Sequence, residues 1–269
     1  MLESRYMAKP SSASGTRVVG FFVVAYALTW LAWAPLVART WGWIPHASQY
    51  LHLLGGLGPA LAALWFASRE GALAALVRTI VTAPPRWLLF AVGAPALVFC
   101  LAAAALVVAG VDVDLSATGR SVEYPELGLG LYILANVVAY GFGEEIGWRG
   151  YALPRLEHRW GSTRATLLVA VGWAGWHLPL FVFSSGMSAM GPFEIVGWFA
   201  SIVSGAFLMT FLYEASGSIL ATAVFHATLD VLIGSPTGGP LQSTMGAIVT
   251  IAGFVVPGLW ARHRSRRAA

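Results

Sequence analysis

The segment WLLFAVGAPALVFCLAAAALVVA, residues 87–109, contains no charged side chain in 23 residues. A helix needs about 20 apolar residues to cross roughly 30 Å of hydrocarbon, so this segment predicts a transmembrane helix. The whole chain has the same character, because 58% of its 269 residues are hydrophobic and only 10% are charged, whereas an ordinary soluble domain carries about 25% charged residues. A water-soluble monomer is therefore excluded, and we expect an all-α integral membrane bundle.

Eight segments of the chain are apolar enough to be membrane spans. They are residues 18–37, 50–68, 87–109, 128–147, 165–183, 193–213, 218–233 and 244–261. The fourth is interrupted by polar residues and the seventh is short. Together they predict one transmembrane domain over residues 18–262, preceded by a flexible tail of residues 1–17 and followed by a basic tail of residues 263–269.

The basic residues alternate from loop to loop along the predicted spans. Fourteen Lys and Arg residues fall on one side and two, Arg39 and Arg120, on the other. Cytoplasmic loops carry the excess of Lys and Arg, so we expect both termini in the cytoplasm, an even number of spans and location in a bacterial cell membrane. No basic stripe with interleaved aromatics and no Walker A motif is present, so we expect neither a nucleic acid nor a nucleotide as partner.

Few ionisable side chains fall within the spans, where each costs about 2.5 to 3.5 kcal/mol on insertion scales. The set is Glu144, Glu145, Arg149, His177, His226 and Asp230. Residues four apart share a helix face, so we expect Glu145 to pair with Arg149 and leave Glu144 free. The same spacing predicts a pair of His226 and Asp230.

Each of these residues has a structural explanation when it is taken alone. The two glutamates could cap a span near the lipid headgroups, and the pair of His226 and Asp230 could seal a helix interface. His177 could bond a carbonyl that Pro179 leaves without its helical donor. Their combination favours a function, because Glu144, His177, His226 and Asp230 are all expected in the cytoplasmic half of the membrane, around a water-filled cavity.

Two mechanisms of hydrolysis fit these four side chains. In the first, Glu144, His177, His226 and Asp230 hold a divalent metal ion such as zinc, which activates a bound water. In the second, Glu144 and His177 deprotonate the attacking water without a metal, while His226 and Asp230 stabilise the oxyanion. Neither the H-E-x-x-H motif nor the G-x-S-x-G motif of other hydrolases occurs in the chain.

Three motifs in this order resemble the CPBP family, which comprises the type II CAAX prenyl endopeptidases and bacterial relatives often labelled Abi. The first motif, E-E-x-x-x-R, matches EEIGWR at residues 144–149. The second, F-x-x-x-H, matches WAGWH at residues 173–177, with Trp173 where phenylalanine is usual. The third, H-x-x-x-N or H-x-x-x-D, matches HATLD at residues 226–230.

The resemblance implies an eight-span CAAX-type intramembrane metalloendopeptidase. Such an enzyme would hydrolyse a peptide bond near the C-terminus of a membrane-associated or lipidated protein or peptide. Glu144 and His177 would activate the water, and His226 with Asp230 would hold the oxyanion or complete a metal shell. The supporting residues would be Glu145, Arg149 and Trp173.

The chain departs from the usual residues of the family pattern at Trp173 and has aspartate rather than asparagine at Asp230. Trp173 keeps an aromatic wall at the position of the usual phenylalanine. An ionised Asp230 would repel an oxyanion, so it must be protonated, paired with His226 or bound to a metal.

The sequence also predicts how a substrate reaches the site. We expect the cavity to open to the cytoplasm through a mouth made basic by the arginines at 149, 155, 159 and 164, which would attract the C-terminal carboxylate of a substrate. The alternative to an enzyme is a non-catalytic membrane scaffold, immunity protein or permease that uses the same buried polar network.

Overall fold

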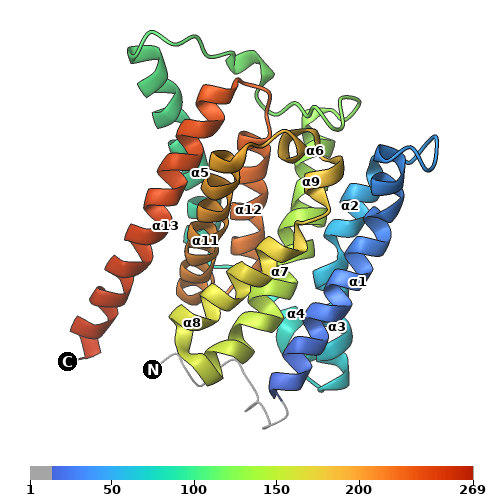
Figure 1. Ribbon diagram of the computed structural model, residues 1–269. Coiled ribbons are helices and arrows are strands. Elements are labelled where there is room, and N and C mark those ends of the chain that lie inside the picture. The colour runs from blue at the N-terminus through green and yellow to red at the C-terminus, as the bar shows by residue number, and fades with distance from the viewer. Residues whose placement is uncertain (1–13, 269) are drawn as a thin grey trace.

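The computed structural model describes residues 14–268, and all regular structure in this range is helical (Figure 1). The long single helices are α1 (Ser14–Thr40), α5 (Pro85–Val108), α11 (Pro192–Ser216), α12 (Ile219–Ile233) and α13 (Gly239–Ala268). The remaining passes are broken into α2 (Tyr50–Gly56) and α3 (Gly58–Arg69), then α6 (Leu129–Ala135), η2 (Asn136–Phe142) and α7 (Gly143–Gly147), and finally η3 (Trp148–Ala152), α8 (Leu153–Trp176) and α9 (Leu180–Phe183). The short elements α4 (Leu73–Val81), η1 (Leu115–Ala117) and α10 (Ser185–Ser188) lie in the connections.

Six helical stretches among the described residues are long and apolar enough to cross a membrane, and α12 is a shorter apolar helix. One of the six, Leu129–Phe183, contains 55 residues and would be about 80 Å long as a single helix, more than twice the hydrocarbon thickness. It turns back instead, because Gly161 has non-helical angles of φ 74° and ψ 163°. Figure 1 shows the chain passing down through α6 and α7 and returning through α8. The all-α membrane bundle is confirmed, and each of the eight predicted spans corresponds to a helix or a broken helix.

The two ends of the bundle differ in charge. α1 begins and α13 ends at the same end (Figure 1), as an even number of passes requires. We call this the arginine end, because the connections that meet there carry Arg69, Arg78, Arg86, Arg155 and Arg159. The other is called the acidic end, because the long connection between α5 and α6 carries Asp112, Asp114, Glu123 and Glu126.

The predicted tails are shorter than expected where the structure describes them. α1 already begins at Ser14, and Arg17 lies 3.7 Å from Glu70 as an ion pair. Residues 14–17 are therefore helical rather than part of a flexible tail. The rest of the predicted N-terminal tail, residues 1–13, lies outside the described residues. α13 continues past residue 262 to Ala268.

Glycines allow the segment that carries Glu144 and Glu145 to pack closely against its neighbours. α7 has only five residues and lies between two π-helical segments, η2 and η3; π-helical turns are frequent at functional sites. A Cβ at Gly143 would collide with the backbone of Gly56, and a Cβ at Gly147 would collide with Pro59. Only glycine lets α7 lie against the junction of α2 and α3, and this contact holds both glutamates inside the bundle.

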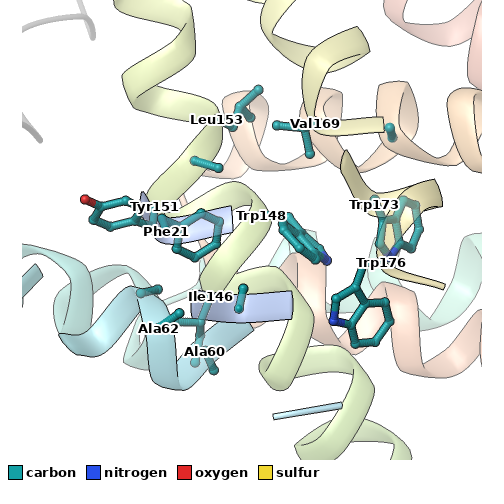
Figure 2. Close-up of a cluster of buried hydrophobic side chains, with 14 of the residues drawn as sticks. Phe21, Ala60, Ala62, Ile146, Trp148, Tyr151, Leu153, Val169, Trp173 and Trp176 are labelled. Carbon is teal, nitrogen blue, oxygen red and sulfur yellow. The ribbon is translucent and has the colours of Figure 1, made fainter. Parts of the chain in front are cut away.

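A core rich in aromatic side chains supports α7 from the side of α1 and α8 (Figure 2). Phe21 packs against Trp148, with ring centroids 5.8 Å apart, and Trp148 packs against Trp176 at 6.1 Å. Trp176 also donates its indole N–H to Thr29 Oγ1 at 2.8 Å. Large rigid rings have few rotamers to lose and bury much apolar area, so this core fixes the backbone on which the polar residues stand.

Candidate active site

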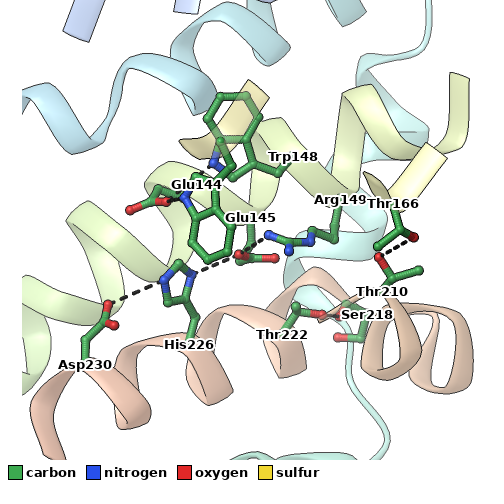
Figure 3. Close-up of polar contacts among 11 residues, drawn as sticks. Glu144, Glu145, Trp148, Arg149, Thr166, Thr210, Ser218, Thr222, His226 and Asp230 are labelled. Carbon is green, nitrogen blue, oxygen red and sulfur yellow. Dashed lines mark hydrogen bonds and ion pairs between the residues drawn. The ribbon is translucent and has the colours of Figure 1, made fainter. Parts of the chain in front are cut away.

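Glu145 lies at the centre of a fully buried ionic contact between α7, η3 and α12 (Figure 3). Its Oε1 accepts a hydrogen bond from Arg149 Nη1 at 2.8 Å, and the same oxygen lies 2.9 Å from His226 Nδ1. Because a carboxylate accepts, the proton of this contact resides on Nδ1. The predicted pair of Glu145 and Arg149 is confirmed, and His226 joins it across the helix interface.

His226 also faces Asp230, as the spacing predicts. His226 Nε2 lies 3.5 Å from Asp230 Oδ2, so the imidazole stands between two carboxyl groups (Figure 3). The Asp230 side chain is 36% exposed, whereas Glu145 and Arg149 are completely buried. The four linked side chains, Arg149, Glu145, His226 and Asp230, therefore form a row. It runs from the buried interior at Arg149 to a partly exposed position at Asp230.

Glu144 is not free of partners, in contrast to the expectation from the sequence. Its Oε2 accepts the indole N–H of Trp173 at 2.5 Å, and Trp148 Nε1 lies 3.4 Å from the same oxygen. No described residue donates a hydrogen bond to Oε1. The spacing of four residues between Glu144 and Trp148 could have suggested the weaker contact, but Trp173 belongs to another helix and was expected only as an aromatic wall.

His177 ends α8 with its tautomer fixed by the backbone. Its own N–H bonds Ala174 O at 3.2 Å, which leaves Trp173 O free to accept from His177 Nδ1 at 2.8 Å. Since a carbonyl can only accept, Nδ1 carries the proton and Nε2 presents its lone pair. From the sequence, His177 could have bonded the carbonyl that Pro179 leaves without its helical donor. Its partner is indeed a carbonyl, but it is Trp173 O, which is free because the last turn of α8 is tightened.

One indole ring brings the predicted residues together. Trp173 bonds Glu144, and its ring centroid lies 5.6 Å from the ring of His177 and 5.4 Å from that of His226. Asp230 joins the group only through His226. Two helices and the α7 segment thus place a carboxylate and two imidazoles around a common ring.

Two of the four site residues, His177 and Asp230, lie nearer the acidic end than the sequence suggested. Asp230 lies three residues before Ile233, the last residue of α12, and Ser218 at the start of that helix is tied to Thr82 O at the arginine end. His177 lies twelve residues beyond Ala165, the start of its predicted span, a rise of about 18 Å out of roughly 30 Å of hydrocarbon. Both residues are therefore nearer the acidic end of the bundle than the arginine end.

Two of the four arginines predicted to form a basic mouth at the arginine end are engaged inside the bundle, while Arg159 and Arg164 are exposed. Arg149 is buried in the pair with Glu145, and Arg155 is bound to Glu70 Oε2 at 2.5 Å. Trp148, Tyr151 and Leu153, which follow Glu144 and Glu145 along the chain, are fully buried. The accessible residue of the site, Asp230, lies toward the acidic end.

A polar cluster between the site and the acidic end was missed by the sequence analysis. His52 Nδ1 lies 3.0 Å from Glu123 Oε2, and the hydroxyl groups of Tyr124 and Tyr140 lie 3.4 Å apart. Tyr140 is within electrostatic reach of both Glu123 and Asp230. These residues come from three separate stretches of the chain without a common spacing, so no local pattern could have joined them.

The residues that could bind a metal do not converge on one point. No group of three or more His, Cys, Asp or Glu side chains within the described part of the chain is arranged to hold a metal ion. Two of the donor atoms are engaged elsewhere, since Glu144 Oε2 accepts from an indole and His226 Nδ1 is bonded to Glu145. A zinc site needs at least three such ligands, so this geometry does not fit one.

The segment that carries the site matches a known family. Residues 126–232 match the family model described as type II CAAX prenyl endopeptidase Rce1-like. The resemblance predicted from the three motifs is confirmed. The Rce1-like segment contains Glu144, Trp173, His177, His226 and Asp230, whereas all of α1 to α5 and all of α13 lie outside it.

A curated protein that carries the name of a CAAX protease is also similar to part of this chain. Over 93 residues the chain is 31% identical to the protein named CAAX prenyl protease 2 of Methanococcus maripaludis. The alignment covers 33% of this chain and 34% of the relative. The matched part thus spans about a third of the curated protein.

Proposed function

We propose that the protein is a CAAX-type intramembrane endopeptidase acting on a membrane-associated peptide or a lipidated protein. The observation that supports this most is the state of Glu144, a buried carboxylate with one oxygen anchored by indole N–H groups and the other open. A positioned carboxylate of this kind is what general-base catalysis needs. The similarity of residues 126–232 to the Rce1-like family supports the choice of a peptide bond.

In the proposed reaction Glu144 accepts a proton from water through Oε1, and the water attacks the scissile carbonyl. The tetrahedral intermediate then collapses with cleavage of the C–N bond, and the proton held by Glu144 passes to the leaving amine. His177 assists through Nε2, which has a lone pair because Nδ1 is protonated against Trp173 O. His226 is protonated on both ring nitrogens in this proposal: Nδ1 donates to Glu145, which holds the ring in place, and Nε2 is the donor that faces the developing oxyanion. Oxyanion donors of this type commonly contribute about 10²- to 10³-fold to kcat.

We propose that Glu144 activates the water without a metal ion. The support is geometric, because the four candidate ligands do not converge on one point, and Glu144 Oε2 and His226 Nδ1 already have other partners. Asp230 then acts on the orientation and charge of His226, rather than as a metal ligand.

The proposal is tested by incubating the purified protein with a membrane-inserted peptide and analysing the products by mass spectrometry. Cleavage by the wild type that Glu144→Gln abolishes is the expected result. Equal cleavage by both proteins, or by neither, would contradict it.

We further propose that substrates enter from the acidic end. The large side chains that follow Glu144 and Glu145 along the chain are fully buried, while Asp230 and the cluster around Glu123 are accessible from the acidic end. If the arginine-rich connections are cytoplasmic, as the excess of Arg and Lys predicts, the peptide bond is presented on the outer side of the membrane.

Cysteine labelling tests this orientation in a Cys100→Ser background, since Cys100 is the sole cysteine of the chain. Val122→Cys at the acidic end and Arg159→Cys at the arginine end both occupy exposed positions. A membrane-impermeant maleimide added to intact cells should label Val122→Cys, and should label Arg159→Cys only after permeabilisation. The reverse pattern would place the entrance on the cytoplasmic side.

A further inference from the structure

Trp173 has a polar contact that the usual phenylalanine of its motif cannot make. Its indole N–H donates to Glu144 Oε2 at 2.5 Å, a hydrogen bond to a group that is charged when ionised. The second donor to the same oxygen, Trp148 Nε1, is at 3.4 Å and is therefore much weaker. The orientation of the Glu144 carboxyl group depends mainly on Trp173.

The ring of Trp173 is itself held from several sides. The guanidinium carbon of Arg149 lies 5.1 Å from the ring centroid, a cation–π distance. The ring of His226 meets it edge-on, at an interplanar angle of 83° and 5.4 Å between centroids. The backbone oxygen of Trp173 also accepts from His177 Nδ1. The indole is buried, so its N–H points in one fixed direction.

We propose that Trp173 is a positioning residue that holds Glu144 Oε2 so that Oε1 faces the attacking water. This inference rests on the function proposed above. The indole N–H acts through Glu144 and does not touch the substrate, so its loss should affect turnover rather than substrate binding. Holding a catalytic group in the productive geometry is a large part of the rate advantage of an active site.

The kinetic test compares Trp173→Phe with Trp33→Phe, both in the purified protein with the membrane peptide. Trp33 is also fully buried and also donates its indole N–H, but to His52 O at 3.0 Å. Trp173→Phe should lower kcat about 10- to 100-fold, the effect of losing a hydrogen bond to a charged group, with KM changed by less than about twofold. Trp33→Phe should leave kcat within about twofold of the wild type.

Combining Trp173→Phe with Glu144→Gln separates positioning from a general loss of packing. If Trp173 acts through Glu144, the double variant should have the same residual rate as Glu144→Gln, because residues that work as a unit are not additive. A further fall in the double variant, or a rise of KM in Trp173→Phe with kcat unchanged, would overturn the proposal.

A spectroscopic test observes the hydrogen bond independently of any hydrolysis. In protein labelled with ¹⁵N-indole tryptophan, the wild type should show one indole proton shifted strongly downfield. This resonance should be absent in Trp173→Phe, displaced upfield in Glu144→Gln and unchanged in Trp33→Phe. Absence of the downfield resonance from the wild type overturns the positioning role. Its presence in a protein that cleaves no peptide refutes the proposed function while confirming the contact.

Discussion

Glu144→Gln is expected to lower the rate of peptide hydrolysis by about 10²- to 10⁴-fold, the range for loss of a general base, while the protein stays folded. Glutamine has the shape of glutamate, and its amide oxygen can still accept the indole N–H of Trp173. It cannot take a proton from water. The rate is measured with purified protein and a membrane-inserted peptide, and folding is checked by thermal unfolding in the same detergent.

Glu194→Gln is the matched control for this substitution. Glu194 accepts a hydrogen bond from Gly191 N at 2.6 Å at the exposed start of α11 and contacts none of Glu144, Trp173 or His226 in the described hydrogen bonds. Its replacement should leave the rate of hydrolysis unchanged. Hydrolysis by Glu144→Gln at the rate of the Glu194→Gln control would show that another group activates the water.

Arg149→Met is expected to destabilise the protein by about 3 to 5 kcal/mol, the usual cost of leaving one charge of a buried pair without its partner. Arg149 and Glu145 are both completely buried, and the pair spans only 2.8 Å. Methionine fills much of the volume of the arginine stem but offers no donor to Glu145. The free energy of unfolding in detergent measures the effect.

Two further variants distinguish the lost charge partner from lost packing. The double variant Arg149→Met with Glu145→Gln should be more stable than Arg149→Met alone, because no uncompensated charge then remains in the interior. Arg155→Met should cost less, since its pair with Glu70 lies near the arginine end and is partly hydrated. A double variant no more stable than Arg149→Met would assign the effect to packing.

The helices could be predicted from the sequence because membrane insertion depends on the hydropathy of continuous segments. Each predicted span coincides with a helix or a broken helix, to within a few residues at most ends. The pair of Glu145 and Arg149 followed from the same local logic, because residues four apart meet on any helix. The short helix α4 was missed, since nine residues are too few to give a span signal.

The arrangement of the site depends on contacts that no local spacing encodes. Trp173 meets Glu144 from 29 residues away, and His226 meets Glu145 from 81 residues away. The angle between helices decides which of their side chains touch, and hydropathy does not report it. The position of His177 and Asp230 nearer the acidic end could have been found from the sequence, because both lie beyond the middle of their predicted spans.

The most direct test of the central claim is the activity of metal-free protein. Purified wild type is treated with a strong chelator, its residual zinc is quantified by mass spectrometry, and cleavage of the membrane peptide is measured before and after zinc is added back. Water activated by Glu144 alone predicts full cleavage by the metal-free protein and no gain from zinc. Cleavage that disappears with the metal and returns in proportion to added zinc would contradict the account.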